Sequence, residues 1–85
     1  MIKGTTQTGF SYEIDDKRLA NYELLEYLSE LDTNPLLLPK IVKILLGDQA
    51  IALKNHVRDE NGLVDMNKMS NEISDIFENQ KQLKN

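Results

Sequence analysis

Residues 33–47 read TNPLLLPKIVKILLG, and this stretch decides the predicted fold. Pro39 cannot lie four residues into a helix that begins at Pro35, because its ring would clash with the preceding turn and its missing amide would leave a hydrogen bond unmade. We therefore expect residues 34–38 to form a turn or distorted helical piece, and the main helix to begin at Pro39. Gly47 is the residue type expected where that helix ends and the chain reverses.

The helix predicted over 39–46 is apolar nearly all round. Such a helix is either central to a core or partly exposed for a partner, and in a domain this small full enclosure is difficult. Both interpretations stay open at this point. If the segment forms an interface, the residues expected to bind the partner are Leu36, Leu37, Leu38, Ile41, Val42 and Leu45, with Lys40 and Lys43 at the rim.

Residues 1–14 predict a β-hairpin. Phe10, Tyr12 and Ile14 alternate with polar residues, which is the period of a half-buried strand. Residues 7–9 supply a turn that contains a glycine. Because a lone hairpin is marginally stable in water, we expect its apolar side to pack on the helices that follow.

Asp15 and Asp16 favour the start of a helix, since carboxylates there accept free amide hydrogens and complement the helix dipole. From about residue 19 to residue 31 apolar side chains recur at helical spacing, and glutamates occupy the opposite side. We expect one helix here. Its apolar residues are Leu24, Leu25, Leu28 and Leu31, joined by Tyr22 and Tyr27.

Two more helices complete the prediction. Asp48 is a candidate cap for a helix over 49–59, which would bury Ala50, Leu53 and Val57 with Ile51 beside them. Asp65 can cap a last helix, and the spacing from Val64 to Met69 is that of a hydrophobic staple. That helix would bury Met66, Met69, Ile73, Ile76 and Phe77 before it frays through 79–85.

Residues 58–69, RDENGLVDMNKM, resemble the middle of an EF-hand loop when Gly62 takes the sixth position. In that alignment the first position is Val57 and the twelfth is Lys68. A calcium ion would need carboxylates at both positions, so the two anchoring ligands are missing. We interpret the stretch as a helix–turn–helix connection held by a glycine, a cap and a staple, and expect no metal site.

Composition excludes further classes of function. The chain has no cysteine, and His56 is its one histidine, so disulfides, thiolate sites and two-histidine zinc motifs are absent. No serine lies in a nucleophile-elbow context and no phosphate loop is present, so we expect neither catalysis nor a cofactor. No apolar run reaches signal-peptide or membrane-span length, which predicts a cytoplasmic protein without a membrane partner.

Charge is distributed unevenly along the 85 residues. Residues 1–34 hold seven acidic and three basic side chains, residues 35–58 one and four, and residues 59–85 six and three. We expect carboxylates of the two ends to lie near the lysines of the middle. The acidic total disfavours binding to nucleic-acid phosphates, although Lys54, His56 and Arg58 could form the contact side of a helix-turn-helix reader.

The sequence therefore predicts an α+β fold in which a short N-terminal β-hairpin packs on a small bundle of about four α-helices. Residues 1–80 would form a single domain, with the hairpin over 1–14, the helices over 15–80 and a frayed polar tail over 81–85.

Three stretches, in this order and spacing, resemble a family of small proteins from the tail-gene region of phages and prophages of Gram-positive bacteria, the tail assembly chaperones. They are IKGTTQTGFSYEID, NPLLLPKIVKILLG and HVRDENGLVDMNKMSNEISDIFE.

This resemblance implies a non-enzymatic protein of the bacterial host cytoplasm that is absent from the mature virion. Its partners would be the helical tape-measure protein, which it keeps soluble, and the tail-tube protein, which it helps to assemble. Two alternatives remain open: a homo-oligomeric structural or scaffold protein with the apolar helix as its seam, and a small regulatory nucleic-acid-binding protein.

Overall fold

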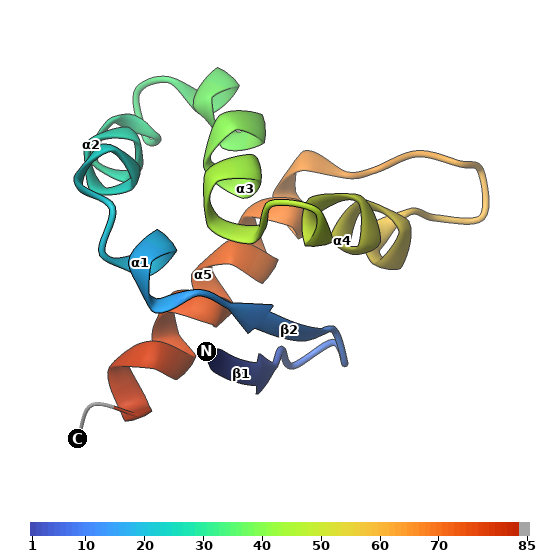
Figure 1. The fold of residues 1–85 in the computed structure, drawn as a ribbon. Helices are drawn as coiled ribbons and strands as arrows, with labels where there is room; N and C mark the ends of the chain where they lie inside the picture. The colour runs from blue at the N-terminus through green and yellow to red at the C-terminus, as the bar shows by residue number, and fades with distance from the viewer. Residues whose placement is uncertain (84–85) are drawn as a thin grey trace.

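The computed structural model describes residues 1–83, and it has the predicted α+β architecture, in which a two-stranded antiparallel hairpin is followed by packed helices (Figure 1). The elements in chain order are β1 (Ile2–Thr5), β2 (Ser11–Ile14), α1 (Asp16–Leu19), α2 (Tyr22–Glu30), the short 3₁₀ helix η1 (Pro35–Leu37), α3 (Leu38–Leu46), α4 (Gln49–Val57) and α5 (Met66–Leu83).

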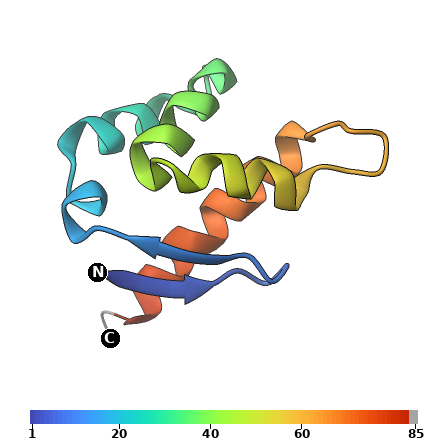
Figure 2. The ribbon, with the colours of Figure 1, turned by 45° about the vertical axis from the view of Figure 1, so that its right-hand side comes forward.

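The hairpin forms as its alternating pattern predicts. Ile2 pairs with Ile14 and Thr5 with Ser11, and the turn is closed by hydrogen bonds between residues 6 and 10 and between 6 and 9. Gly9 adopts a φ of 96°, which a residue with a side chain rarely does. Phe10, Tyr12 and Ile14 are all buried. Figure 2 shows α5 running across the hairpin, so the helix covers the face that these side chains occupy.

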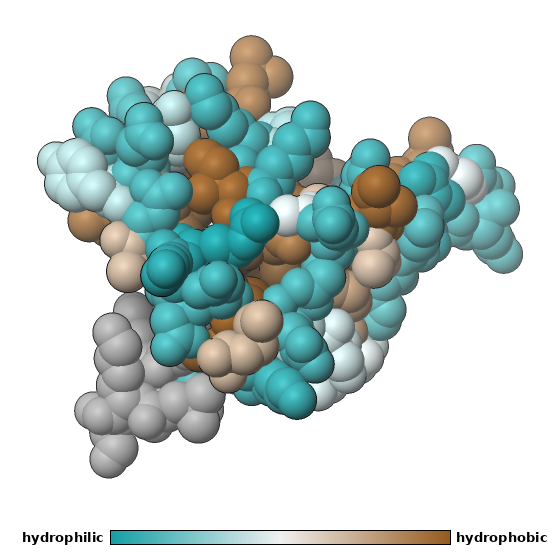
Figure 3. Space-filling model, viewed as in Figure 1, coloured by the Kyte–Doolittle hydropathy of each residue, from teal (hydrophilic) through white to brown (hydrophobic). Residues whose placement is uncertain are grey.

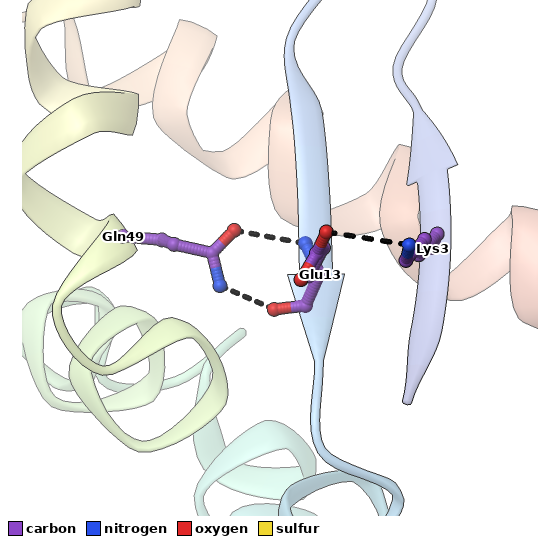
Figure 4. Close-up of polar contacts among 3 residues, drawn as sticks. All are labelled: Lys3, Glu13 and Gln49. Carbon is purple, nitrogen blue, oxygen red and sulfur yellow. Dashed lines mark hydrogen bonds and ion pairs between the residues drawn. The ribbon is translucent and has the colours of Figure 1, made fainter.

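The outer edge of β2 is closed by a side chain. Gln49, the first residue of α4, accepts a hydrogen bond from the backbone amide of Glu13 at 2.8 Å and donates one from its Nε2 to the carbonyl of the same residue (Figure 4). The carboxamide thus makes the pair of bonds that a neighbouring strand would make. On the exposed face, Lys3 of β1 lies 3.6 Å from the Glu13 carboxylate.

The helix expected from Asp15 to Leu31 is instead two helices. Asp15 caps α1 through the amide of Lys17, but α1 ends after one turn. Asn21 then has extended backbone angles, and its side chain accepts a hydrogen bond from the amide of Glu23. An asparagine that offers the backbone a cap of its own breaks a helix locally. The predicted apolar side is confirmed for Leu24, Leu28 and Leu31, whereas Tyr22 and Leu25 are exposed, and the competing cap was missed.

The prolines act as predicted. η1 occupies Pro35–Leu37, and α3 begins at Leu38, one residue before the expected start at Pro39. Gly47 ends the helix with a φ of 58°, and its amide donates to the carbonyl of Lys43.

Of the two predicted caps near α4 and α5, one is present. The Asp65 carboxylate accepts from the Asn67 amide at 2.8 Å, as expected. The prediction for Asp48 was wrong, because its side chain makes no capping hydrogen bond and its backbone is itself helical. The φ of Gly47 already turns the chain into α4 without a side-chain cap.

The last helix is longer than predicted. α5 continues to Leu83, so residues 81–83 are helical rather than frayed, and residues 84–85 of the expected tail lie outside the described residues. Met69, Ile73 and Ile76 are buried and Phe77 packs partly against the core, but Met66 is 55% exposed.

The connection between α4 and α5 is ordered by one carboxylate. Asp59 Oδ1 accepts from the amides of Asn61 and Leu63 at 2.9 and 3.0 Å. Gly62 has a φ of 84°, and its carbonyl accepts from the Arg58 guanidinium. The Asp59 carboxylate in this loop therefore serves to bond the loop's own backbone. The loop projects away from the body of the molecule (Figure 1).

A single core joins the hairpin to the helices. Its least exposed large side chains come from β2, α2, α3, α4 and α5, which ties every layer together. They are Ile14, Leu24, Ile41, Leu45, Leu53 and Ile76.

Candidate functional site

The candidate site is a groove of about 640 Å³ beside α3, which we call the α3–α4 groove. One wall is η1 and the start of α3, the second wall is α4, and the third is formed by the end of the α4–α5 loop and the first turn of α5. The lining residues are Pro35, Leu36, Leu38, Pro39, Val42, Lys43, Gly47, Asp48, Ala50, Ile51, Lys54, Val64, Met66 and Met69.

The local sequence explains why this groove is open. Pro35 starts η1 and Pro39 lies in the first turn of α3, and Leu36 between them is 85% exposed. The abrupt turn at Gly47 then sends α4 away from α3 (Figure 1). Because no element in the described part of the chain fills the angle between the two helices, its surface stays accessible.

The groove is apolar in its floor and on its rim. The floor consists of core residues that reach the surface only slightly, among them Leu38, Val42, Ala50 and Met69. The rim carries large apolar side chains that water surrounds: besides Leu36, Ile51 is 63% and Met66 55% exposed. Contiguous exposed apolar surface of this kind marks binding sites in soluble proteins.

Outside the groove, exposed apolar side chains are unevenly distributed over the surface of the molecule. In the view of Figure 3, brown apolar atoms emerge as separate spots between teal polar side chains. Among the residues whose burial the structure describes, the exposed large apolar residues outside the groove are Met1, Tyr22, Leu25 and Leu63.

Two lysines give the groove a positive border. Lys43 of α3 and Lys54 of α4 line it, together with one carboxylate, Asp48, at the corner between the helices. Of the acidic residues at the two ends of the sequence, Glu23 acts on a lysine of the middle segment, because its charge contributes to raising the pKa of Lys40. Other carboxylates of the first segment pair locally, as Asp16 does with the N-terminal amino group at 3.4 Å.

The predicted partner-binding residues divide into three groups. Leu36, Leu38, Val42 and Lys43 line the groove, so the structure brings these four together. Ile41 and Leu45 have no exposed surface. The expectation that these two would contact a partner therefore does not fit the folded chain, because both fill the core between α3 and the hairpin and helices around it.

Leu37 and Lys40 do not line the groove, and Lys40 faces α2. Leu37 is half-buried against the core, and the Lys40 ammonium lies 4.7 Å from the centre of the Tyr27 ring. A hydrogen bond to the Tyr27 side chain raises the pKa of Lys40 above its ordinary value, and the charges of Tyr27 and Glu23 act in the same direction. Lys40 is thus a partner of α2 within the fold.

Sequence reasoning missed several groove residues, above all Ile51 and Met66, which it assigned to the core. The signal was present for Ile51. It follows Ala50 by one position, which is 100° around a helix, and so falls outside the buried stripe of Ala50 and Leu53. An apolar residue displaced from the buried stripe is a candidate for a binding surface.

A second, polar cluster lies where the hairpin turn meets α4 and α5. Glu72 is only 4% exposed, and its two carboxylate oxygens accept from the hydroxyls of Thr6 at 2.9 Å and Thr8 at 2.7 Å. His56 Nε2 lies 3.0 Å from the Thr8 hydroxyl, and its ring packs on Phe10. His56 is thus an exposed helix residue, as expected, but one with partners in the turn.

The two threonine hydroxyls in this cluster both donate to the Glu72 carboxylate. Each threonine has one hydroxyl hydrogen, and both are given to Glu72, so His56 donates its Nε2 hydrogen to Thr8. A histidine that acts as a general base must instead accept the hydroxyl hydrogen of the nucleophile. The arrangement anchors the hairpin turn on α5, and the amide of Gln7 adds a further bond to Asp75.

Within residues 1–83, no group of three or more histidine, cysteine or acidic side chains is placed to hold a metal ion. Nor does this part of the chain contain a helix whose length and hydropathy would let it cross a membrane.

Comparison with protein-family models, with curated proteins and with solved structures finds no match for this chain.

Proposed function

We propose that this protein is a non-enzymatic tail assembly chaperone that binds an amphipathic helix of the phage tape-measure protein in the α3–α4 groove. The observation that carries the proposal is the groove itself, with an apolar floor and with Leu36, Ile51 and Met66 exposed on its rim. The resemblance of the three sequence stretches supplies the identity of the client.

The shape and chemistry of the groove support a helical client. An amphipathic helix buries its apolar face in a hydrophobic groove by inserting side chains spaced three or four residues apart. Met66 on the rim and Met69 in the floor line the groove on the side of α5, and methionine adapts to different side chains because it is unbranched and flexible. A long tape-measure protein offers many similar helical segments, which such an adaptable wall can accept.

The charge of the protein agrees with a chaperone that works in the host cytoplasm before the virion is complete. The net charge is −4, and the acidic residues lie mostly outside the groove segment. When a client helix is bound in the groove, the acidic outer surface of this protein would face the solvent. A net charge far from zero keeps such a complex in solution. Tail-tube protein would then assemble around the released tape-measure protein.

The test is co-expression with the tape-measure protein from the same gene cluster, followed by size-exclusion chromatography with light scattering. We expect a discrete complex that keeps the client soluble. Leu36→Asp combined with Ile51→Asp should abolish the complex and leave the circular dichroism spectrum unchanged, because both side chains are more than half exposed. Leu63→Asp is the matched control, since Leu63 is 65% exposed but lies outside the groove.

Two results would overturn the proposal. One is an insoluble client in the presence of the folded wild-type protein. The other is an unchanged complex with the folded double variant, which would place the binding surface elsewhere.

The nucleic-acid alternative loses support from the geometry of α4. His56 is engaged with Thr8, and the Arg58 guanidinium donates to the carbonyl of Gly62. Two of the three basic residues of the expected contact side therefore serve the fold. The homo-oligomer alternative has a specific observation in its favour, the chemistry of α2.

A further inference from the structure

We propose that the α3–α4 groove also binds the exposed face of α2 from a second copy of this chain, so that the protein self-assembles head to tail. The two surfaces lie on opposite sides of α3. The Lys40 side chain faces α2 of its own chain, whereas Leu38 and Val42 line the groove. At 100° per residue, Leu38 and Val42 each lie about 160° around the helix from Lys40. Figure 1 shows α2 and α4 on either side of α3.

The outer face of α2 has the composition that the groove fits. Tyr22 is 70% and Leu25 61% exposed, and they are three residues apart, so they form one apolar stripe. Glu26 and Glu30 follow Tyr22 by four and eight residues and are exposed on the same side. α2 is therefore a short amphipathic helix with apolar surface directed away from its own core.

Charge complementarity selects a second copy as the occupant. α2 contains three glutamates and no basic residue. The groove is bordered by Lys43 and Lys54, with Asp48 as its one acidic lining residue, and the segment that supplies most of it, residues 35–58, has four basic side chains against one acidic. An acidic apolar helix that approaches a basic apolar groove is steered to it, and two copies related by any other pairing of these surfaces would meet with like charges.

The proposed contact joins different surfaces of the two copies. Such a heterologous contact leaves one free groove and one free α2 face at the two ends of every open assembly. The assembly therefore adds further copies unless its two ends meet and close a ring. Each α3 inside the assembly would then have its own α2 on one side and a neighbour's α2 on the other. A client helix and a neighbouring copy would compete for the same groove, so client binding would release the copies from one another.

Sedimentation velocity of the purified protein, without any client, tests the inference. We expect a mass that rises with concentration and falls as salt is added, because exposed charge pairs are screened. Leu25→Asp, which alters the α2 face, and Ile51→Asp, which alters the groove, should each give a monomer. Leu63→Asp should associate as the wild type does, since its side chain is equally exposed but belongs to neither surface.

Mixing the two monomeric variants decides the geometry. Leu25→Asp retains an intact groove and Ile51→Asp an intact α2 face, so their mixture should form a 1:1 dimer that grows no further. A mixture that stays monomeric would overturn the head-to-tail contact, as would a wild-type protein that is monomeric at every concentration, or a Leu25→Asp variant that still associates.

Charge reversal gives a second test that leaves the apolar side chains intact. Lys43→Glu with Lys54→Glu should weaken self-association about tenfold, since each exposed pair contributes modestly. Adding Glu26→Lys and Glu30→Lys to that variant should restore association. If association stays weak in the folded fourfold variant, the charge argument is wrong. Because no client is present, these outcomes are independent of the chaperone proposal.

Discussion

The two sides of α3 carry the same apolar residue types but differ in how far these side chains are buried. Toward the core, Ile41 and Leu45 have no exposed surface. Toward the groove, the segment presents Leu36, which is 85% exposed, and the partly covered Leu38 and Val42. The comparison teaches that a run of leucine, isoleucine and valine can hold a fold together on one side and offer binding surface on the other.

The largest effect on stability is expected on the core side. Leu45→Ala removes a fully buried side chain, which leaves a cavity and lowers the free energy of unfolding by about 2–5 kcal/mol. Urea denaturation monitored by circular dichroism measures this loss. A loss below 1 kcal/mol would show that the core around α3 collapses to fill the space, or that Leu45 is not buried as described.

A smaller effect separates Asp65 and Asp48, the two aspartates that were predicted to cap α5 and α4. Asp65→Ala should lower the free energy of unfolding by about 1 kcal/mol, because the amide of Asn67 loses its capping oxygen. Asp48→Ala is the control, since Asp48 makes no capping bond, and it should change stability by less than about 0.5 kcal/mol. Equal losses in thermal denaturation of the two variants would contradict the difference between these helix starts.

On the groove side, stability should hardly change. Leu36→Ser and Ile51→Ser each remove an exposed side chain, so we expect the free energy of unfolding to stay within about 0.5 kcal/mol of the wild type. The same urea titration applies. A loss that approaches that of Leu45→Ala would mean that the groove side belongs to the core and is not free to bind a partner.

The smallest effect concerns Lys40. Its pKa should lie above the ordinary 10.5, and Tyr27→Phe should lower it, because the Tyr27 side chain accepts a hydrogen bond from the ammonium. A pKa raised by folding stabilises the folded state below the unfolded value, and that contribution is lost as the pH rises through the folded value. An NMR titration of the Lys40 side chain measures both values. An unchanged Lys40 pKa in the Tyr27→Phe variant would exclude the contact.

Most of the fold was predictable because its signals are local. Proline geometry placed the start of α3 within one residue, alternation placed β2, and the spacing from Asp65 placed α5. The break at Asn21 was not predicted, because a side-chain cap and a continuous apolar pattern compete there and the pattern looked stronger. Asp48 shows the opposite error. Its residue type suits a helix cap, but it makes no capping hydrogen bond, because Gly47 before it already turns the chain into α4.

The candidate site was predictable only in part. Leu36, Leu38, Val42 and Lys43 belong to the groove, but the wall that Ile51, Met66 and Val64 supply comes from segments that meet α3 only in the folded chain. Hydrophobicity alone could not separate Ile41 from Leu36, because that difference arises from which neighbours pack against each residue. The Thr6–Glu72 contact joins residues 66 positions apart and has no sequence signal at all.

The carboxamide of Gln49 has a consequence for how this protein avoids aggregation. A hairpin with two free edges can add strands from other molecules on either side, which is the first step toward a fibre of stacked sheets. With the Glu13 amide and carbonyl bonded to a side chain, β2 offers no such template at this residue. Addition of a strand at this position of the β2 edge is thereby blocked by a single residue of α4.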